Sequence, residues 1–261
     1  MSQRQRPAPS LRPALIASAA LGLLFACGPG PDESTRAVAT SIDRHGGDVF
    51  ERSRIQFTFR DTRFEVVRDG GRFRYERSYP GPDGLMVREI LHNDGVELWI
   101  GDRQAPLDAP ERARIREAIN SVVYFNFLPF HLNDPPVRLR DLGEDQIAGE
   151  PYHRIEVTFR EEGGGDDWDD RFVHWIHRDD HTLDYFAYRY HRGEGGTRFR
   201  RAVNRREIGG VLVQDQENFR SVDPIGDIAD YGQRFDEGSV ELVSMVEMED
   251  VRVEPLEDAL E

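Results

Sequence analysis

The sequence contains a single cysteine, no lysine and only one long hydrophobic run. With Cys27 as its only thiol, the chain cannot form an internal disulfide bond, so an exported form would carry an odd thiol that needs an explanation. The 34 basic residues are all arginines and are outnumbered by 49 acidic residues, which gives a formal net charge of -15. This acidic balance disfavours nucleic acids and anionic lipid surfaces as partners.

The hydrophobic run lies near the N-terminus and has the layout of a secretory signal. Three arginines and no acid precede Ala14–Phe25, which is shorter than the ~20 residues that a permanent transmembrane helix needs. The sequence Leu24-Phe25-Ala26-Cys27 is similar to the lipobox of bacterial lipoproteins. This resemblance implies cleavage before Cys27 and lipid on its thiol, and several acyl chains suffice to hold a protein at a membrane.

The lipobox resemblance also gives a domain organisation and a location. Residues 1–26 are expected to be a signal peptide, residues 27–34 a Pro- and Gly-containing lipidated tether, and residues 35–261 one β-rich domain. Position 28 is glycine and not aspartate. By resemblance to well-studied gram-negative lipoproteins, this favours the outer membrane of the cell envelope over the inner membrane.

Residue periodicity predicts an α+β fold rich in hairpins. Helical spacing of apolar residues predicts helices at about Glu33–Arg44 and Ala109–Phe127. Period-two segments separated by Gly, Asp and Pro turns predict about eleven antiparallel strands. These strands are expected at 55–59, 64–67, 72–76, 87–91, 96–100, 152–159, 172–177, 183–190, 197–208, 211–219 and 239–253.

The segment Leu183–Tyr190 carries apolar side chains on both faces. Leu183, Tyr185 and Ala187 alternate with Phe186, Tyr188 and Tyr190. An antiparallel sheet with one face open to water would not need this pattern. The second face is therefore expected to be covered, by the 109–127 helix or by a ligand.

Several segments resemble a family of uncharacterised gram-negative envelope lipoproteins. They are Asn120–Phe125 with Leu128-Pro129 and Leu132–Asp134, Gly163–Asp167, Trp175-Ile176, Leu183–Tyr188, and Arg198–Arg200 with Asn204. The order of helix and hairpins is similar to the lipoprotein carriers LolA and LolB. That similarity implies a curved antiparallel sheet, an incomplete β-barrel, with two or three helices covering its concave face.

The LolA-like architecture predicts a protein that binds a lipid or another hydrophobic molecule in a cleft. Candidate lining residues are Phe57, Phe59, Phe73, Tyr75, Trp99, Tyr124, Phe125, Phe127, Phe186 and Tyr188, each of which can also be plain core. A polar group of Asn133, Asp134, Asp184, Arg198, Arg200 and Asn204 is expected either to fix a ligand head group or to form a buried structural network.

Enzymatic function has little support in the sequence. There is no Gly-x-Ser-x-Gly motif, phosphate loop or dinucleotide motif, so neither a catalytic residue nor a cofactor is predicted. A carboxylate-based hydrolase or lyase is one alternative function, and an envelope scaffold that binds a protein partner is another. Both alternatives stay open at this stage.

Metal binding is not predicted either. The acidic run Asp166–Asp170 could offer oxygen ligands to Ca²⁺, but it lacks calcium-loop spacing and fits a solvated turn better. Of the nearby histidines, His174 and His177 point to opposite faces of a strand, and His181 lies in the turn beyond. They are expected to be surface or packing residues and not zinc ligands.

Intact-mass analysis of the mature protein tests the N-terminal assignment. We expect a product that lacks residues 1–26 and carries acyl groups on Cys27. A product with an unmodified Cys27, or one that retains the first 26 residues, would contradict it.

Overall fold

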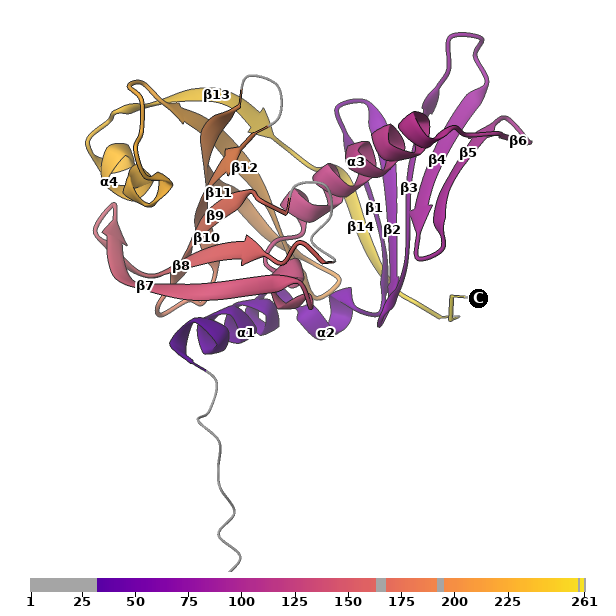
Figure 1. The fold of residues 1–261 in the computed structure, drawn as a ribbon. Helices are drawn as coiled ribbons and strands as arrows, with labels where there is room; N and C mark the ends of the chain where they lie inside the picture. Colours follow the sequence, from indigo (N-terminus) through magenta and orange to yellow (C-terminus); the bar gives the residue numbers. More distant parts are fainter. Residues whose placement is uncertain (1–31, 163–167, 192–194, 258, 261) are drawn as a thin grey trace, which may run out of the picture. The chain divides into compact units, whose positions relative to one another are not determined.

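The strands form two antiparallel sheets in the computed structural model (Figure 1), which describes residues 32–162, 168–191, 195–257 and 259–260. In this part of the chain, sheet A has the strand order β14-β1-β2-β3-β4-β5-β6 and sheet B the order β13-β12-β11-β10-β9-β8-β7. The strands of sheet A are β1 (Ser53–Phe59), β2 (Thr62–Asp69), β3 (Arg72–Pro80), β4 (Met86–His92), β5 (Gly95–Ile100), β6 (Arg103–Ala105) and β14 (Glu249–Pro255). Those of sheet B are β7 (Val137–Ile147), β8 (Glu150–Phe159), β9 (Arg171–His177), β10 (Leu183–Tyr190), β11 (Gly196–Ile208), β12 (Val211–Ser221) and β13 (Val240–Val246).

The helices are α1 (Glu33–His45), α2 (Gly47–Phe50), α3 (Ala109–Asn126) and α4 (Tyr231–Asp236), with the short 3₁₀ helices η1 (Phe130–Asn133) and η2 (Ile228–Asp230). The two long helices, α1 and α3, begin at aspartate caps. Asp108 and Glu111 form a reciprocal capping box at the start of α3. Gly46 ends α1 with a φ of 91°, and a Cβ there would lie 2.0 Å from the carbonyl oxygen of Gly210. The glycine therefore lets the α1–α2 corner approach the β11–β12 turn.

Helix α3 covers one face of sheet A, which we call its inner face. Ile115, Ile119 and Val123 lie one helical turn apart and are almost completely buried. They pack against Phe57 and Tyr75 of the sheet in one hydrophobic cluster. This arrangement confirms the helix that the apolar periodicity predicted.

Sheet B is covered on both faces, as the pattern of 183–190 predicted. On its inner face, Phe186 and Tyr188 pack with α1 and with the C-terminal end of α3. On its outer face, Tyr185 and Ala187 pack against Tyr231 and its neighbours in η2 and α4. The second cover is thus a short segment at 225–235 that the sequence patterns did not reveal.

An ion pair between Arg206 and the buried Asp215 lies where the chain passes from sheet B to sheet A. Asp215 accepts a hydrogen bond from the backbone N–H of Met248 at 3.1 Å, and Arg206 donates to the Met248 carbonyl at 2.6 Å. Arg206 and Asp215 also contact each other at 3.1 Å. Because side chains hold both backbone groups of Met248, the segment 239–253 divides into β13 and β14.

The α+β class and the antiparallel pairing are confirmed, whereas the expected single sheet of about eleven strands is wrong. Three strands account for the difference. The predicted strand at 239–253 is two strands, β6 has only three residues, and β7 was not predicted. Strand β7 has a charged sequence and an irregular register between Asp141 and Glu144, which conceal its period of two.

Glu89, on the inner face of sheet A, links the sheet to α3 by ion pairs. Its buried carboxylate pairs with Arg77 of β3 and, at 2.9 Å, with Arg114 of α3. Burial acts to raise the pKa of Glu89, but hydrogen bonds from Arg77 and Arg114 outweigh it and lower the pKa. The charge is therefore retained and ties helix to sheet.

The N-terminal predictions fall largely outside this structure. The signal peptide and Cys27 lie outside the described residues, while Glu33 and Ser34, the last two residues of the expected tether, lie in the first turn of α1. No helix among the described residues is both long and apolar enough to cross a membrane.

Candidate functional site

A group of aromatic rings lines the inner face of sheet B, and we call it the aromatic wall. It consists of Tyr124 and Phe125 from the last turn of α3, Phe172 from β9, and Phe186 and Tyr188 from β10. Phe125 is stacked on Phe186 with ring centroids 5.9 Å apart and lies 5.1 Å from Tyr188. Tyr124 contacts Phe172 edge-on at 6.1 Å. The wall therefore joins α3 to two strands of sheet B.

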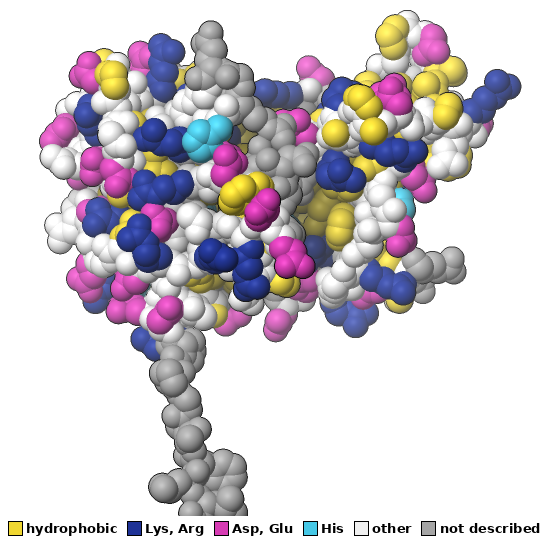
Figure 2. All heavy atoms as spheres, viewed as in Figure 1, with side chains coloured by type: hydrophobic (Ala, Val, Ile, Leu, Met, Phe, Trp, Pro, Cys, Tyr) yellow, Lys and Arg dark blue, Asp and Glu magenta, His cyan; other side chains and the backbone are white. Residues whose placement is uncertain are grey.

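The wall is buried at its base and half-exposed at its rim. Phe186 and Tyr188 are buried, whereas Tyr124 and Phe125 are only half-buried, as are the neighbouring Phe159 and, further along, Tyr190. Figure 2 shows a hollow in the molecular surface below α3 and over the strands of sheet A, with hydrophobic side chains on its floor. The partly exposed side chains of Tyr124 and Phe125 offer aromatic surface to an apolar molecule.

Arg200 of β11 lies within this wall. Its guanidinium carbon is 5.1 Å from the ring centre of Phe125, 5.8 Å from that of Phe186 and 5.7 Å from that of Tyr188. The guanidinium donates hydrogen bonds to the side-chain oxygen of Gln216 at 2.9 Å and to the hydroxyl of Tyr188 at 3.2 Å. Gln216 in turn donates to the carbonyl of Phe125 at 2.8 Å. Within the described residues, the arginine therefore contacts neutral groups.

Two further polar groups are buried in the same region, the imidazole of His174 and the hydroxyl of Tyr124. Both ring nitrogens of His174 and the hydroxyl of Tyr124 have no hydrogen-bond partner among the described residues. Desolvation lowers the pKa of His174 to about 3, and it raises the pKa of Tyr124. Both groups are therefore neutral near pH 7, and both leave hydrogen-bonding capacity unused.

The structure separates the predicted lining residues into three places. Phe57, Tyr75 and Phe127, with Phe59 and Phe73 packed against them, belong to the core between α3 and sheet A. Tyr124, Phe125, Phe186 and Tyr188 belong to the aromatic wall. Trp99 lies on the opposite face of sheet A, where Arg88 stacks on its ring and its indole N–H donates to Glu97.

The six predicted polar residues do not form one network. Asp184 pairs with Arg205 and accepts hydrogen bonds from Thr182 and Tyr152. Asn204 donates to Asp215, and Asp134 contacts His131. Arg198 stacks on Tyr190, and Asn133 is exposed at the end of η1. Only Arg200 reaches the aromatic wall; its partner Gln216, in the neighbouring strand, carried no sequence signal.

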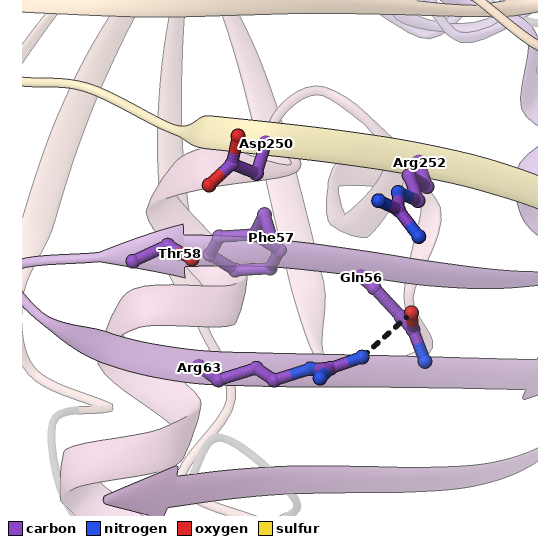
Figure 3. Close-up of a pocket in the computed structure, with 6 residues that line it drawn as sticks. All are labelled: Gln56, Phe57, Thr58, Arg63, Asp250 and Arg252. Carbon is purple, nitrogen blue, oxygen red and sulfur yellow. Dashed lines mark hydrogen bonds between the residues drawn. The ribbon is translucent and has the colours of Figure 1, made fainter.

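Two other concavities lie on sheet A. One has a volume of about 290 Å³ beside the bulge between β1 and β14, where Gln56, Arg63 and Arg252 approach one another and Arg63 donates to Gln56 at 3.0 Å (Figure 3). Its lining is mostly polar, which does not suit an apolar ligand. The other, of about 600 Å³, includes the predicted residue Phe73 with Ile90, but charged side chains surround both.

One group of side chains has the spacing of metal ligands. Ligand atoms of Asp169, Asp170 and His191 lie within 4.8 Å of one another. Asp166 and Asp167, the first residues of the predicted acidic run, lie outside the described residues. His174, His177 and His181 are not among the members of this group.

The pH dependence of stability tests the burial of His174. Because its folded-state pKa of about 3 lies below the unfolded value of 6.5, the unfolded chain gains the proton first as the pH falls. The free energy of unfolding should therefore fall below pH 6.5, with His174 contributing a loss of about 2 kcal/mol by about pH 5. His45, with a pKa lowered to about 4 by desolvation, adds a similar loss.

Urea unfolding of the wild type and of a His174→Leu variant at neutral and mildly acidic pH isolates this contribution. The variant should lose about 2 kcal/mol less than the wild type over the same interval. Identical pH profiles would show that His174 is not buried in a neutral form.

Comparison with known proteins shows the family of this chain. A model of a family of unknown function, DUF6503, matches residues 26–248, and the sequence has no significant match among curated proteins.

The structure is similar to a LolA superfamily protein of Nitrosomonas europaea, with 11% identity, coverage of 85% of this chain and 94% of that chain, and a TM-score of 0.45. A putative outer membrane lipoprotein-sorting protein domain of Vibrio parahaemolyticus has 12% identity, coverage of 87% and 94%, and a TM-score of 0.45. The lipoprotein LppX of Mycobacterium tuberculosis has 14% identity, coverage of 60% and 90%, and a TM-score of 0.27. In agreement with the resemblance to an uncharacterised family seen in the sequence, the chain belongs to the DUF6503 family of unknown function.

Proposed function

We propose that this protein is a lipid-anchored envelope lipoprotein that binds a hydrophobic molecule against the aromatic wall. The observation that carries this proposal is the partly exposed rim of the wall, formed by Tyr124 and Phe125. Ligand sites are typically lined by aromatic and aliphatic side chains with a few polar groups that orient the ligand. The rings supply the first property, and Arg200 with Gln216 supplies the second.

The energetics favour an apolar ligand at this rim. Burying a phenylalanine side chain completely is worth about 1.5–3 kcal/mol, and Phe125 realises only part of that in the protein alone. A ligand that displaces water from Tyr124 and Phe125 would gain the rest. The two sheets with α3 between them would then take the role of the half-barrel that the element order predicted.

The location of the protein is part of the same proposal. The lipobox-like sequence at Cys27 would place the domain at an envelope membrane, with the outer membrane favoured by Gly28. A protein held there by lipid would meet lipids and other apolar molecules at high local concentration. Both inferences come from the sequence alone.

An envelope scaffold is the second candidate, and one surface feature favours it. Leu85, Met86 and Ile100 are 49%, 47% and 38% exposed and lie together near the β3–β4 turn. Hydrophobic side chains gather at this end of the molecule, at the upper right of Figure 2. Exposed apolar patches often mark protein interaction sites. Crosslinking in cells that captured one stoichiometric partner through this hairpin would favour the scaffold.

Binding of the neutral apolar fluorophore N-phenyl-1-naphthylamine to the purified protein tests the hydrophobic site. We expect saturable binding with one site per chain. Phe125→Ala should weaken it roughly tenfold, because it removes about half of the contact energy of a phenylalanine ring.

Trp99→Ala is the matched control, since Trp99 is also a half-buried aromatic residue but lies on the outer face of sheet A. The Phe125→Ala and Trp99→Ala variants share the same N-terminal segment, so any fluorescence from dye bound to that segment is the same for both. Circular dichroism would verify that both variants are folded. If the wild type shows no saturable binding, or if Trp99→Ala weakens it as much as Phe125→Ala, the proposed site is wrong.

A further inference from the structure

Arg200 is a buried cation without a counter-ion among the described residues. It is 9% exposed, and its recorded partners are the side-chain oxygen of Gln216, the hydroxyl of Tyr188 and three aromatic rings. Its Nε–H has no hydrogen-bond partner in the described part of the chain. The charge is therefore surrounded by neutral groups and is incompletely hydrogen-bonded.

Other buried charges in this protein have an opposite charge beside them. Glu89 is paired with Arg77 and Arg114. Glu156 contacts Arg140 at 2.6 Å and Arg171 at 2.5 Å. This contrast separates Arg200 from the ion pairs that stabilise the fold.

The cost of leaving such a charge unpaired is substantial. The desolvation of an ion inside a protein costs more free energy than cation–π contacts return. Neutral hydrogen bonds from Gln216 and Tyr188 recover a further part. An anion bound at the guanidinium would offset most of the remaining desolvation cost. Binding of an acidic group at this site is therefore favourable.

The surroundings of Arg200 also define the shape of such a ligand. Phe125, whose ring covers the guanidinium, is half-buried and belongs to the rim of the wall. Tyr124 contacts Phe125 edge-on, and His174 stacks on Phe186. The hydroxyl of Tyr124 and the ring nitrogens of His174 are buried without hydrogen-bond partners among the described residues. A polar head would thus lie at the base of the wall, and an apolar chain would lie along its rim.

We propose that the hydrophobic molecule is an anionic single-chain amphiphile whose acidic head group pairs with Arg200 while its chain lies along Tyr124 and Phe125. This inference rests on the proposed function and specifies its ligand class. Carboxylates and phosphates both suit a guanidinium, which forms two parallel hydrogen bonds with either. Phe125 must turn aside to admit the head group.

Three ligands with the same alkyl chain test this proposal: dodecanoate, dodecyl phosphate and dodecanol. Their affinities for the purified protein would be measured by displacement of N-phenyl-1-naphthylamine at about pH 8, where the carboxylate is ionised. We expect the wild type to prefer at least one of the two anions over the alcohol by roughly 10- to 100-fold, the range for a charge-assisted hydrogen bond. The anion with the larger preference identifies the head group as carboxylate or phosphate.

Substitutions at Arg200 assign that preference to its charge. Arg200→Gln should bind the anion and the alcohol equally, whereas Arg200→Lys should retain a reduced preference for the anion. Arg201→Gln is the matched control, because Arg201 is the next residue in β11, pairs with Glu217 and stacks on Phe235 of the outer face. It should keep the wild-type preference.

The outcomes separate the two proposals. If all three ligands bind the wild type equally, the head-group assignment is wrong and the hydrophobic site stands. If none binds, the site itself fails, and the head-group assignment fails with it. Should the Arg200 variants not fold, ¹⁵N NMR of the arginine side chains in the wild type decides: a buried Nε signal must move on addition of the anion and not of dodecanol.

Discussion

The packing of α3 against both sheets is the interaction on which the rest of this structure depends. Successive residues of a helix point about 100° apart, so one helix can present different faces to two partners. Ile119 and Val123 enter the core of sheet A, whereas Tyr124 and Phe125 turn toward sheet B. A polar contact secures each end: Arg114 pairs with Glu89 of sheet A, and the carbonyl of Phe125 accepts a hydrogen bond from Gln216 of sheet B. The orientation of the aromatic wall follows from this double attachment.

The charges of the protein act on two different length scales. The net charge of -15 repels anionic surfaces at long range, and salt at physiological concentration screens that repulsion beyond about 8 Å. The guanidinium of Arg200 acts at contact distance in an environment of aromatic rings, where the dielectric constant is low and an electrostatic interaction is strong. An acidic protein can therefore reject anionic membranes as a whole and still bind one acidic head group.

The sequence predicted the local elements well and the long-range contacts poorly. Hairpin strands and the helix at 109–127 could be read because their apolar residues repeat with a fixed period and end at Gly, Asp or Pro. The division of 239–253 depends on Asp215 and Arg206 in other strands, which no local pattern shows. Trp99, by contrast, shares a face of β5 with Glu97, opposite Val96 and Leu98, so the alternation along the strand was enough to indicate the outer face. Arg200 was a candidate polar residue in the sequence. The sequence could not show which arginines have a carboxylate partner, because such pairs form across strands, as Arg205 does with Asp184.

Photolabelling with an alkyl diazirine tests the central claim most directly, because it reports where an apolar molecule binds without any substitution. After irradiation of the purified protein and digestion, mass spectrometry would locate the label. The account predicts that the label concentrates in the peptides that carry Tyr124 and Phe125 and in those that carry Phe186 and Tyr188, and that excess unlabelled ligand removes it. A label confined to the exposed β3–β4 hairpin, or spread over the surface without competition, would contradict it.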